Sequence, residues 1–245
     1  MPISAIAKPS RLTAMPRFRL WHSLNARSLR VLWTFEECGL KRRRDYDLVT
    51  LPFPPRQHTP DFLERNPLGT VPWFEHTEPG DTAGPRAAMS ESCAVPMYLV
   101  DLLDSPLGVQ VHEPCRGAYL NWLHHADATL TFPQAVAMRY GLHEPGRADA
   151  AAEDYARWFV ARLRLLTACL ADGRQFLCGD RFTVADVCVG FALFNASRHG
   201  LLGSGLVAAG REPLCERFKP QTRAYLDRLM ARPAWDAAQR EQLQK

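Results

Sequence analysis

The chain has 245 residues, of which 47% are hydrophobic and 23% are charged, and its formal net charge is +4. These proportions are close to those of an average globular protein and exclude a disordered, collagen-like or coiled-coil chain. The charge is too small and too dispersed to bind nucleic acid by itself, although small anionic substrates are compatible with it. No apolar stretch approaches the roughly 20 residues that span a bilayer. We therefore expect a folded cytoplasmic protein of enzyme size, without nucleic-acid or membrane partners.

The seven cysteines are scattered along the chain without a C-x-x-C pair. Such a set is typical of free thiols in a reducing compartment, and it argues against a disulfide framework or a zinc site. We expect no metal. Residues 1–17 lack the continuous hydrophobic segment of a secretory signal and are predicted to form a disordered extension.

The first half of the chain predicts a β-α-β unit followed by a β-β-α unit. The sequence indicates, in chain order, a strand, a helix, a second strand and a helical turn. A turn leading into a third strand, a fourth strand and a final helix follow. These elements are expected at 18–22, 26–38, 46–51, 61–65, 66–75, 87–89 and 90–104. Together they predict one domain over residues 18–104.

The second half of the chain has only helical patterns. Residues 105–114 contain two prolines and a glycine and are predicted to be a linker. Beyond it, apolar residues recur at three- and four-residue spacing, as in the helices of a bundle. The predicted helices cover 116–130, 149–170, 184–197 and 220–230. Residues 115–245 are therefore expected to form an all-helical domain.

Short motifs at the starts of these elements resemble those of one family. They are Arg-Ser-Leu-Arg-Val-Leu-Trp at 27–33, Asn-Pro-Leu-Gly-Thr-Val-Pro at 66–72, Ser-Glu-Ser-Cys-Ala-Val at 90–95 and Phe-Thr-Val-Ala-Asp at 182–186. The order and spacing of these motifs resemble those of the bacterial type of the cytosolic glutathione S-transferase family. The resemblance extends from Phe18 to Trp235. The resemblance implies an α+β thioredoxin-like N-terminal domain (β-α-β-α-β-β-α) and an all-α C-terminal bundle. It also implies a homodimer, with glutathione as co-substrate and no permanently bound cofactor.

The Val71–Pro72 bond is the first candidate contact for glutathione. A cis bond would turn the Val71 N–H and C=O outward, where they can pair with an extended peptide. Spacing alone favours a trans proline at the start of a strand, whereas the resemblance implies the cis form. It also implies that Thr70, Val71 and Pro72 contact glutathione.

Glu91 and Ser92 precede an apolar helix, whose N-terminal N–H groups suit a carboxylate. Simple capping by serine is the alternative. The resemblance implies that both residues bind the γ-glutamyl carboxylate, and that Asp127 reaches the γ-glutamyl amine from the partner subunit. An ordinary acid on a helix surface is the alternative for Asp127. Thr183 and Asp186 predict a purely structural capping box with a hydrophobic staple.

Glutathione transfer requires a thiolate, whereas a cysteine thiol ordinarily titrates near about 8.5, so the protein must supply donors to the sulfur. In the family these come from the loop after the first strand. Here the serine position of that loop holds Asn25, and the cysteine position holds Arg27. We expect the Asn25 amide, or next the Ser28 hydroxyl, to act catalytically as this donor, with Arg27 adding positive potential. Alternatively, Asn25 caps the first helix and Arg27 is simply solvated.

Two further groups complete the predicted site. Residues 56–58, which end in His58, lie in the loop that faces the glycine carboxylate in related proteins. Tyr119, Trp122 and His125 share one predicted helix and would line a pocket for the electrophile, although aromatic residues at this spacing are more often core.

The predicted function is conjugation of the glutathione thiolate to a small hydrophobic electrophile, as in detoxification. Two alternatives remain open. One is glutathione-dependent reduction of disulfides or peroxides at the same site, and the other is a non-catalytic homologue that only binds glutathione.

Overall fold

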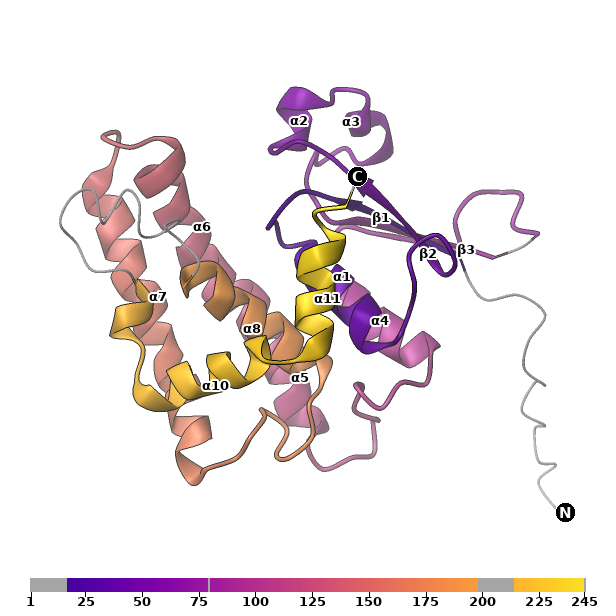
Figure 1. Ribbon diagram of the computed structural model, residues 1–245. Coiled ribbons are helices and arrows are strands. Elements are labelled where there is room, and N and C mark those ends of the chain that lie inside the picture. The colour runs from indigo at the N-terminus through magenta and orange to yellow at the C-terminus, as the bar shows by residue number, and fades with distance from the viewer. Residues whose placement is uncertain (1–16, 79, 198–213, 245) are drawn as a thin grey trace, which may run out of the picture.

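The computed structural model describes residues 17–78, 80–197 and 214–244, which form a small α+β domain and a helical domain side by side (Figure 1). The predicted extension at 1–17 lies outside the described residues except for Arg17, which begins the first strand.

A mixed four-stranded sheet forms the centre of the N-terminal domain. The strands are β1 (Arg17–His22), β2 (Tyr46–Thr50), β3 (Trp73–Thr77) and β4 (Ala87–Met89), in the order β2-β1-β3-β4. β1 is parallel to β2 and antiparallel to β3, which is antiparallel to β4. This is the predicted thioredoxin-like arrangement, with each strand close to its expected position.

The helices of this domain are α1 (Leu29–Glu37), α2 (Pro55–His58), α3 (Phe62–Arg65) and α4 (Ala94–Leu102). α1 begins three residues later than the sequence predicted. Residues 23–28 form consecutive turns instead, because the Ala26 N–H binds the Ser23 carbonyl and the Leu29 N–H binds the Ala26 carbonyl. The loop after β1 therefore extends to Ser28.

The helical domain follows a stretch of turns between Leu102 and Arg116 that contains no helix or strand. Its elements include two π-helical and two 3₁₀ segments. They are α5 (Arg116–His124), η1 (His125–Thr131), α6 (Phe132–Met138), η2 (Arg139–His143), α7 (Asp149–Cys169), η3 (Leu170–Asp172), α8 (Val184–Ser197), η4 (Leu214–Arg217), α10 (Pro220–Met230) and α11 (Pro233–Glu241). The four predicted helices are present, whereas α6 and α11 were not predicted.

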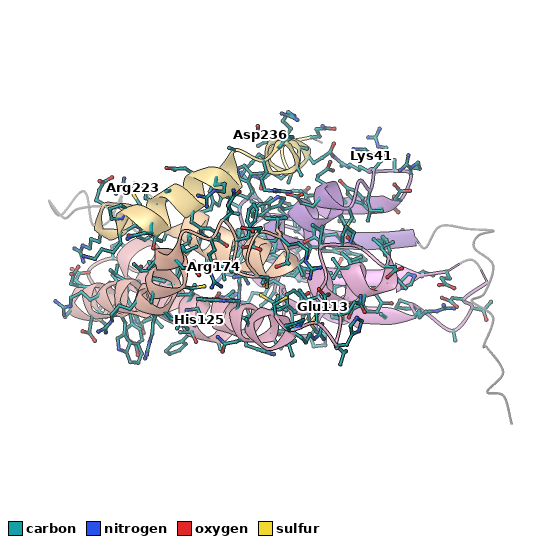
Figure 2. All side chains as sticks on the ribbon, turned by 90° about the horizontal axis from the view of Figure 1, so that it is seen from below. Lys41, Glu113, His125, Arg174, Arg223 and Asp236 are labelled. Atoms are coloured by element: carbon teal, nitrogen blue, oxygen red, sulfur yellow. The ribbon has the colours of Figure 1, made fainter. Side chains whose placement is uncertain are left out.

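The last helix, α11, returns from the helical domain and lies along α1 (Figure 1). Trp235 packs edge-on against Trp33 with ring centroids 4.8 Å apart, and Arg232 donates to both Glu37 oxygens at 2.6 and 2.8 Å. Figure 2 shows Asp236 of this helix on the same side of the molecule as Lys41, opposite His125 and Glu113. Only Trp235 and Ala238 of α11 are buried, so the helix contributes few side chains to the core.

One hydrophobic core runs through both domains. α8 lies at its centre, where nearly every residue of the helix is buried. At Gly190 an added Cβ would lie 2.6 Å from the Leu229 side chain and 3.3 Å from the Trp33 ring, so only glycine allows this approach. The two domains are therefore joined by close apolar packing.

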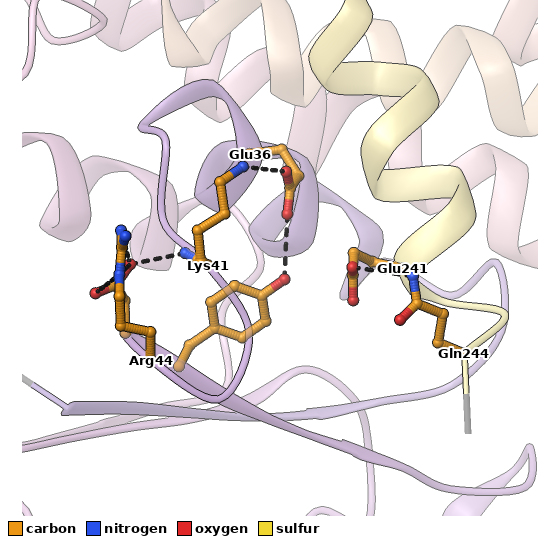
Figure 3. A network of polar contacts seen from close by, with 7 residues as sticks. Glu36, Lys41, Arg44, Glu241 and Gln244 are labelled. Atoms are coloured by element: carbon orange, nitrogen blue, oxygen red, sulfur yellow. Dashed lines mark hydrogen bonds and ion pairs between the residues drawn. The ribbon is translucent and has the colours of Figure 1, made fainter.

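Two local predictions can be compared with the structure. Asp186 reaches back to the Thr183 N–H at 2.8 Å, as in a capping box, but the Thr183 hydroxyl also donates to this carboxylate at 3.1 Å. The basic run at 41–44 forms a turn after α1, where Lys41 pairs with Glu36 at 3.7 Å and Arg44 with Asp45 at 2.6 Å (Figure 3).

All seven cysteines are free, as predicted. Among the described residues, no helix has both the length and the apolar character of a membrane span.

Candidate functional site

The loop after β1 is held by a buried hydrogen-bond cluster. The Ser28 hydroxyl lies 2.8 Å from His22 Nδ1 and accepts the Ser23 N–H at 3.4 Å. His22, Ser23 and Ser28 have no exposed surface. Ser28, one of the two predicted thiolate donors, therefore has its hydroxyl engaged inside the loop.

Burial also determines the charge of His22. It lowers the pKa of His22 from 6.5 to about 4, and the neighbouring Gln242 amide offsets only part of this shift. The imidazole is therefore neutral at pH 7, where it acts as a fixed polar support for the loop.

Asn25, the other predicted donor, lies at the outer turn of this loop and is half-buried. Its φ of 60° is in the left-handed region, which asparagine tolerates better than most residues. Ser28 occupies the N-cap position of α1, so Asn25 does not cap that helix. Instead, the Asn25 N–H donates to Gln242 Oε1 at 3.0 Å, and Gln242 Nε2 donates to Asn25 Oδ1 at 3.1 Å.

The Val71–Pro72 bond is cis, as the resemblance implied. In the described part of the chain, neither the N–H nor the C=O of Val71 makes a hydrogen bond. The Val71 side chain is buried with Trp21 and Phe62, and Ala26 packs against the same cluster. The loop that carries Asn25 therefore adjoins a backbone segment with an unused donor and acceptor.

The turn before Val71 is fixed by Asn66 and Gly69. Asn66 Nδ2 donates to the Thr70 carbonyl at 2.8 Å, and its Oδ1 accepts the Leu68 N–H at 3.1 Å. Gly69 has a φ of 58°, and a Cβ there would lie 2.6 Å from Arg56 Cβ. α2 thus packs directly on this turn, and His58 is exposed at the end of that helix.

Glu91 and Ser92 lie just before α4, with Glu91 exposed and Ser92 nearly buried. The Ser92 hydroxyl oxygen accepts a hydrogen bond from Arg30 Nη1 at 2.8 Å. Because that donor occupies a lone pair of the oxygen, the hydroxyl proton is left to donate.

Arg30 is a fully buried cation at the junction of the two domains. Its guanidinium pairs with Asp127 at 3.2 Å and also donates to the Ala126 carbonyl and the Thr131 hydroxyl, each at 3.4 Å. A buried charge is tolerated only when it is paired and hydrogen-bonded, and these contacts satisfy both Nη groups, while Nε has no partner among the described residues. Asp127, predicted to reach glutathione across a dimer, is thus bound to Arg30 of its own chain, with its side chain 27% exposed.

The three residues predicted to line an electrophile pocket lie in the interior of the helical domain. Tyr119 has no exposed surface, and Trp122 and His125 are 4% and 9% exposed. The Trp122 and His125 rings contact each other at 5.2 Å. Aromatic residues at helical spacing pack most of their surface into the core, as these do, and their assignment to an electrophile pocket stays a prediction. Arg27, by contrast, is an exposed residue of the loop after β1.

Three residues of this region were not singled out from the sequence: His22, Arg30 and Gln242. The signal for Arg30 was its place inside the apolar run of α1, all of which is buried from Leu29 to Phe35. No local signal identifies Gln242, because its partner is 217 residues away. In the described part of the chain, no cluster of three or more His, Cys, Asp or Glu is arranged to hold a metal ion.

The fold defines a class: a thioredoxin-like domain with a cis proline at Val71–Pro72, joined to a helical bundle. Residues 26–101 match the family model described as glutathione S-transferase, N-terminal domain. Glutathione S-transferase 3 of Zea mays is 27% identical over 237 residues, which cover 93% of this chain and 91% of the maize protein.

Solved structures give the same result for the fold. A glutathione transferase family member from Pseudomonas fluorescens, with two glutathione bound, has a TM-score of 0.71 at 22% identity, covering 91% of this chain and 92% of its own. A glutathione transferase from Phanerochaete chrysosporium in complex with oxidised glutathione has a TM-score of 0.72 at 23% identity, covering 92% and 96%. Residues 26–101 thus match a glutathione S-transferase N-terminal domain, and the chain shares its fold with these solved glutathione transferases.

Proposed function

We propose that this protein binds glutathione on its thioredoxin-like domain and conjugates the thiolate to small apolar electrophiles. The observation that carries the proposal is the backbone of Val71, which lies beside the Asn25 loop and makes no hydrogen bond to any residue that the structure describes. An extended tripeptide pairs with such a backbone as a strand does at a sheet edge. Glutathione is then a co-substrate, and conjugation requires no permanently bound cofactor.

The γ-glutamyl end of glutathione is assigned to Glu91 and Ser92. The N–H groups before α4 and the free proton of Ser92 suit its carboxylate, and buried Arg30 adds positive charge directly behind Ser92. Asp127, which remains partly exposed, has the charge to attract the γ-glutamyl amine. Thr70, Val71 and Pro72 then support the cysteinyl part, and the exposed His58 is assigned to the glycine carboxylate.

The sulfur is assigned to the Asn25 amide. Ser28 is the second candidate, but its hydroxyl is engaged by His22. An amide N–H aimed at the sulfur stabilises the thiolate more than the thiol, and this lowers the pKa of the bound ligand. The exposed Arg27 adds to the positive potential of the loop.

The loop at 22–28 holds no cysteine, so reduction through a protein thiol is not available there. Reduction of a disulfide or peroxide by glutathione alone, and binding without turnover, are the competing functions. We also propose that the protein works in the cytoplasm as a homodimer.

One preparation tests these functions together. Calorimetry with reduced glutathione is expected to give a saturable heat, and 1-chloro-2,4-dinitrobenzene, as a model apolar electrophile, is expected to be conjugated. Reduction of hydroxyethyl disulfide without conjugation would favour the reductase, and binding without either reaction would favour the non-catalytic homologue. No heat at millimolar glutathione contradicts all three.

A further inference from the structure

Gln242, near the C-terminus, hydrogen-bonds Asn25 in the loop that carries the proposed hydrogen-bond donor to the thiolate. Gln242 follows α11 directly and is only 4% exposed, although it stands three residues from the end of the chain. α11 is anchored along α1 by Arg232 and Trp235. The position of α11 therefore fixes where the Gln242 side-chain amide meets the loop.

The two hydrogen bonds between Gln242 and Asn25 determine how both amides are oriented. A backbone N–H can only donate, so the Asn25 N–H requires the oxygen of the Gln242 amide, at 3.0 Å. The nitrogen of Gln242 must then face the Asn25 side chain, at 3.1 Å. A donor at that point requires the Asn25 oxygen, and the Asn25 Nδ2 group is consequently the end that is turned away.

The orientation of Asn25 decides what the loop offers to a ligand. Nδ2 makes no hydrogen bond in the part of the chain that the structure describes, and Asn25 is half-buried. With the amide turned the other way, the carbonyl oxygen would face the ligand, and its partial negative charge would repel a thiolate.

We propose that Gln242 is a positioning residue, which holds the Asn25 amide with its N–H toward the glutathione sulfur. The inference rests on the proposed function, because it assumes that the sulfur lies at Asn25. It adds that thiolate formation depends on the C-terminal helix, through one reciprocal pair of hydrogen bonds.

The decisive variant is Gln242→Glu. A carboxylate of the same length still accepts the Asn25 N–H, but it cannot donate to Asn25 Oδ1. The Asn25 amide is then expected to rotate and give its N–H to Glu, presenting the oxygen to the sulfur. The matched control is Gln244→Ala, since among the described residues the exposed Gln244 side chain hydrogen-bonds Glu241 (Figure 3) and not Asn25.

The readout is the pKa of the bound glutathione thiol, followed by thiolate absorbance near 240 nm in the full-length protein. We expect Gln242→Glu to raise this pKa and to lower kcat/KM for conjugation at pH 6.5 about tenfold, with Gln244→Ala unchanged. Binding of S-methylglutathione, which has no ionisable thiol, is expected to stay within about twofold for both variants. Equal losses of thiolate and of S-methylglutathione binding by Gln242→Glu would overturn the positioning role and indicate a structural one.

A double-variant comparison checks the route of the effect. In an Asn25→Gly background the amide is absent, so Gln242→Glu is expected to cause no further change in thiol pKa. The same change in both backgrounds would overturn the proposal. If the wild-type protein binds S-methylglutathione but leaves the pKa of bound glutathione unshifted, thiolate activation fails together with the inference. If the wild type activates the thiol and Gln242→Glu does so equally well, the inference alone fails.

Discussion

Two polar clusters support the two domains, and they differ in how completely their groups are paired. In the helical domain the buried Asp186 carboxylate accepts four donors: the N–H groups of Leu177 and Thr183, and the hydroxyls of Thr183 and Tyr225. In the thioredoxin-like domain, the Asn25 side-chain Nδ2 and the Val71 N–H and C=O make no hydrogen bond within the residues that the structure describes. A cluster whose polar groups are all hydrogen-bonded stabilises the fold. A cluster at the surface with unpaired polar groups can hydrogen-bond a ligand.

The largest expected effect is on the saturated cluster. Asp186→Ala removes four hydrogen bonds and leaves buried donors without partners, so the free energy of unfolding should fall by about 4 kcal/mol. Urea denaturation measures this loss in the free energy of unfolding. Asp154→Ala is the control, because Asp154 is 69% exposed and its pair with Arg157 is a surface ion pair. A loss below about 1 kcal/mol for Asp186→Ala would contradict the structural role of this cluster.

The loop cluster predicts a pH dependence of stability through His22. The folded pKa is about 4 and the unfolded value is 6.5, so the unfolded chain binds more protons between them. The stability from neutral His22 is complete above pH 6.5 and is lost as the pH falls toward 4, by about 1 kcal/mol per pH unit.

Urea denaturation at pH 7 and pH 4.5 tests this prediction in His22→Asn, which retains a polar side chain without a titrating ring. The difference in stability between the two pH values should be smaller in this variant than in the wild type. His124→Asn, at an exposed position, should behave as the wild type does. Identical pH profiles for wild type and His22→Asn would show that His22 is not buried as described.

A smaller effect is expected at the donor itself. Asn25→Asp keeps the left-handed backbone acceptable but replaces the N–H by a negative charge. Loss of a hydrogen bond to a charged sulfur is worth about 2 kcal/mol, which raises the pKa of bound glutathione by about 1.5 units. Ser28→Ala, by contrast, should alter stability through His22 with little change in thiol pKa. A raised thiol pKa in Ser28→Ala, with an unchanged thiol pKa in Asn25→Asp, would assign the sulfur to Ser28.

The smallest predicted effect concerns the γ-glutamyl end. Ser92→Ala removes one donor to the ligand carboxylate and should weaken glutathione binding about tenfold, or about 1.4 kcal/mol. Calorimetry measures the change, with Ser90→Ala in the same segment as control. Unchanged glutathione affinity in Ser92→Ala would show that the γ-glutamyl carboxylate does not bind at the start of α4.

The sequence predicted the elements whose signals are local. The four strands, the start of α8 and the turn ahead of Val71 each depend on neighbouring residues. α11 was not predicted, although it carries two buried residues, Trp235 and Ala238. The aromatic residues of α5 and η1 were assigned to a pocket because periodicity identifies a buried face without saying what covers it.

The candidate site was predictable only in part for the same reason. The positions of Asn25, Val71 and Ser92 follow from motifs at the ends of strands and helices. Their partners do not, since Arg30 joins Ser92 to Asp127, and Gln242 reaches Asn25 from the other end of the chain. Such contacts depend on how the two domains pack.

A crystal structure of the protein with reduced glutathione, at a resolution that locates the sulfur, tests the central claim most directly. We predict that the tripeptide pairs with the Val71 backbone and that Asn25 Nδ2 is the protein atom nearest to the sulfur, within about 3.5 Å. Glutathione bound away from Val71, or a sulfur nearest to the Ser28 hydroxyl, would contradict it.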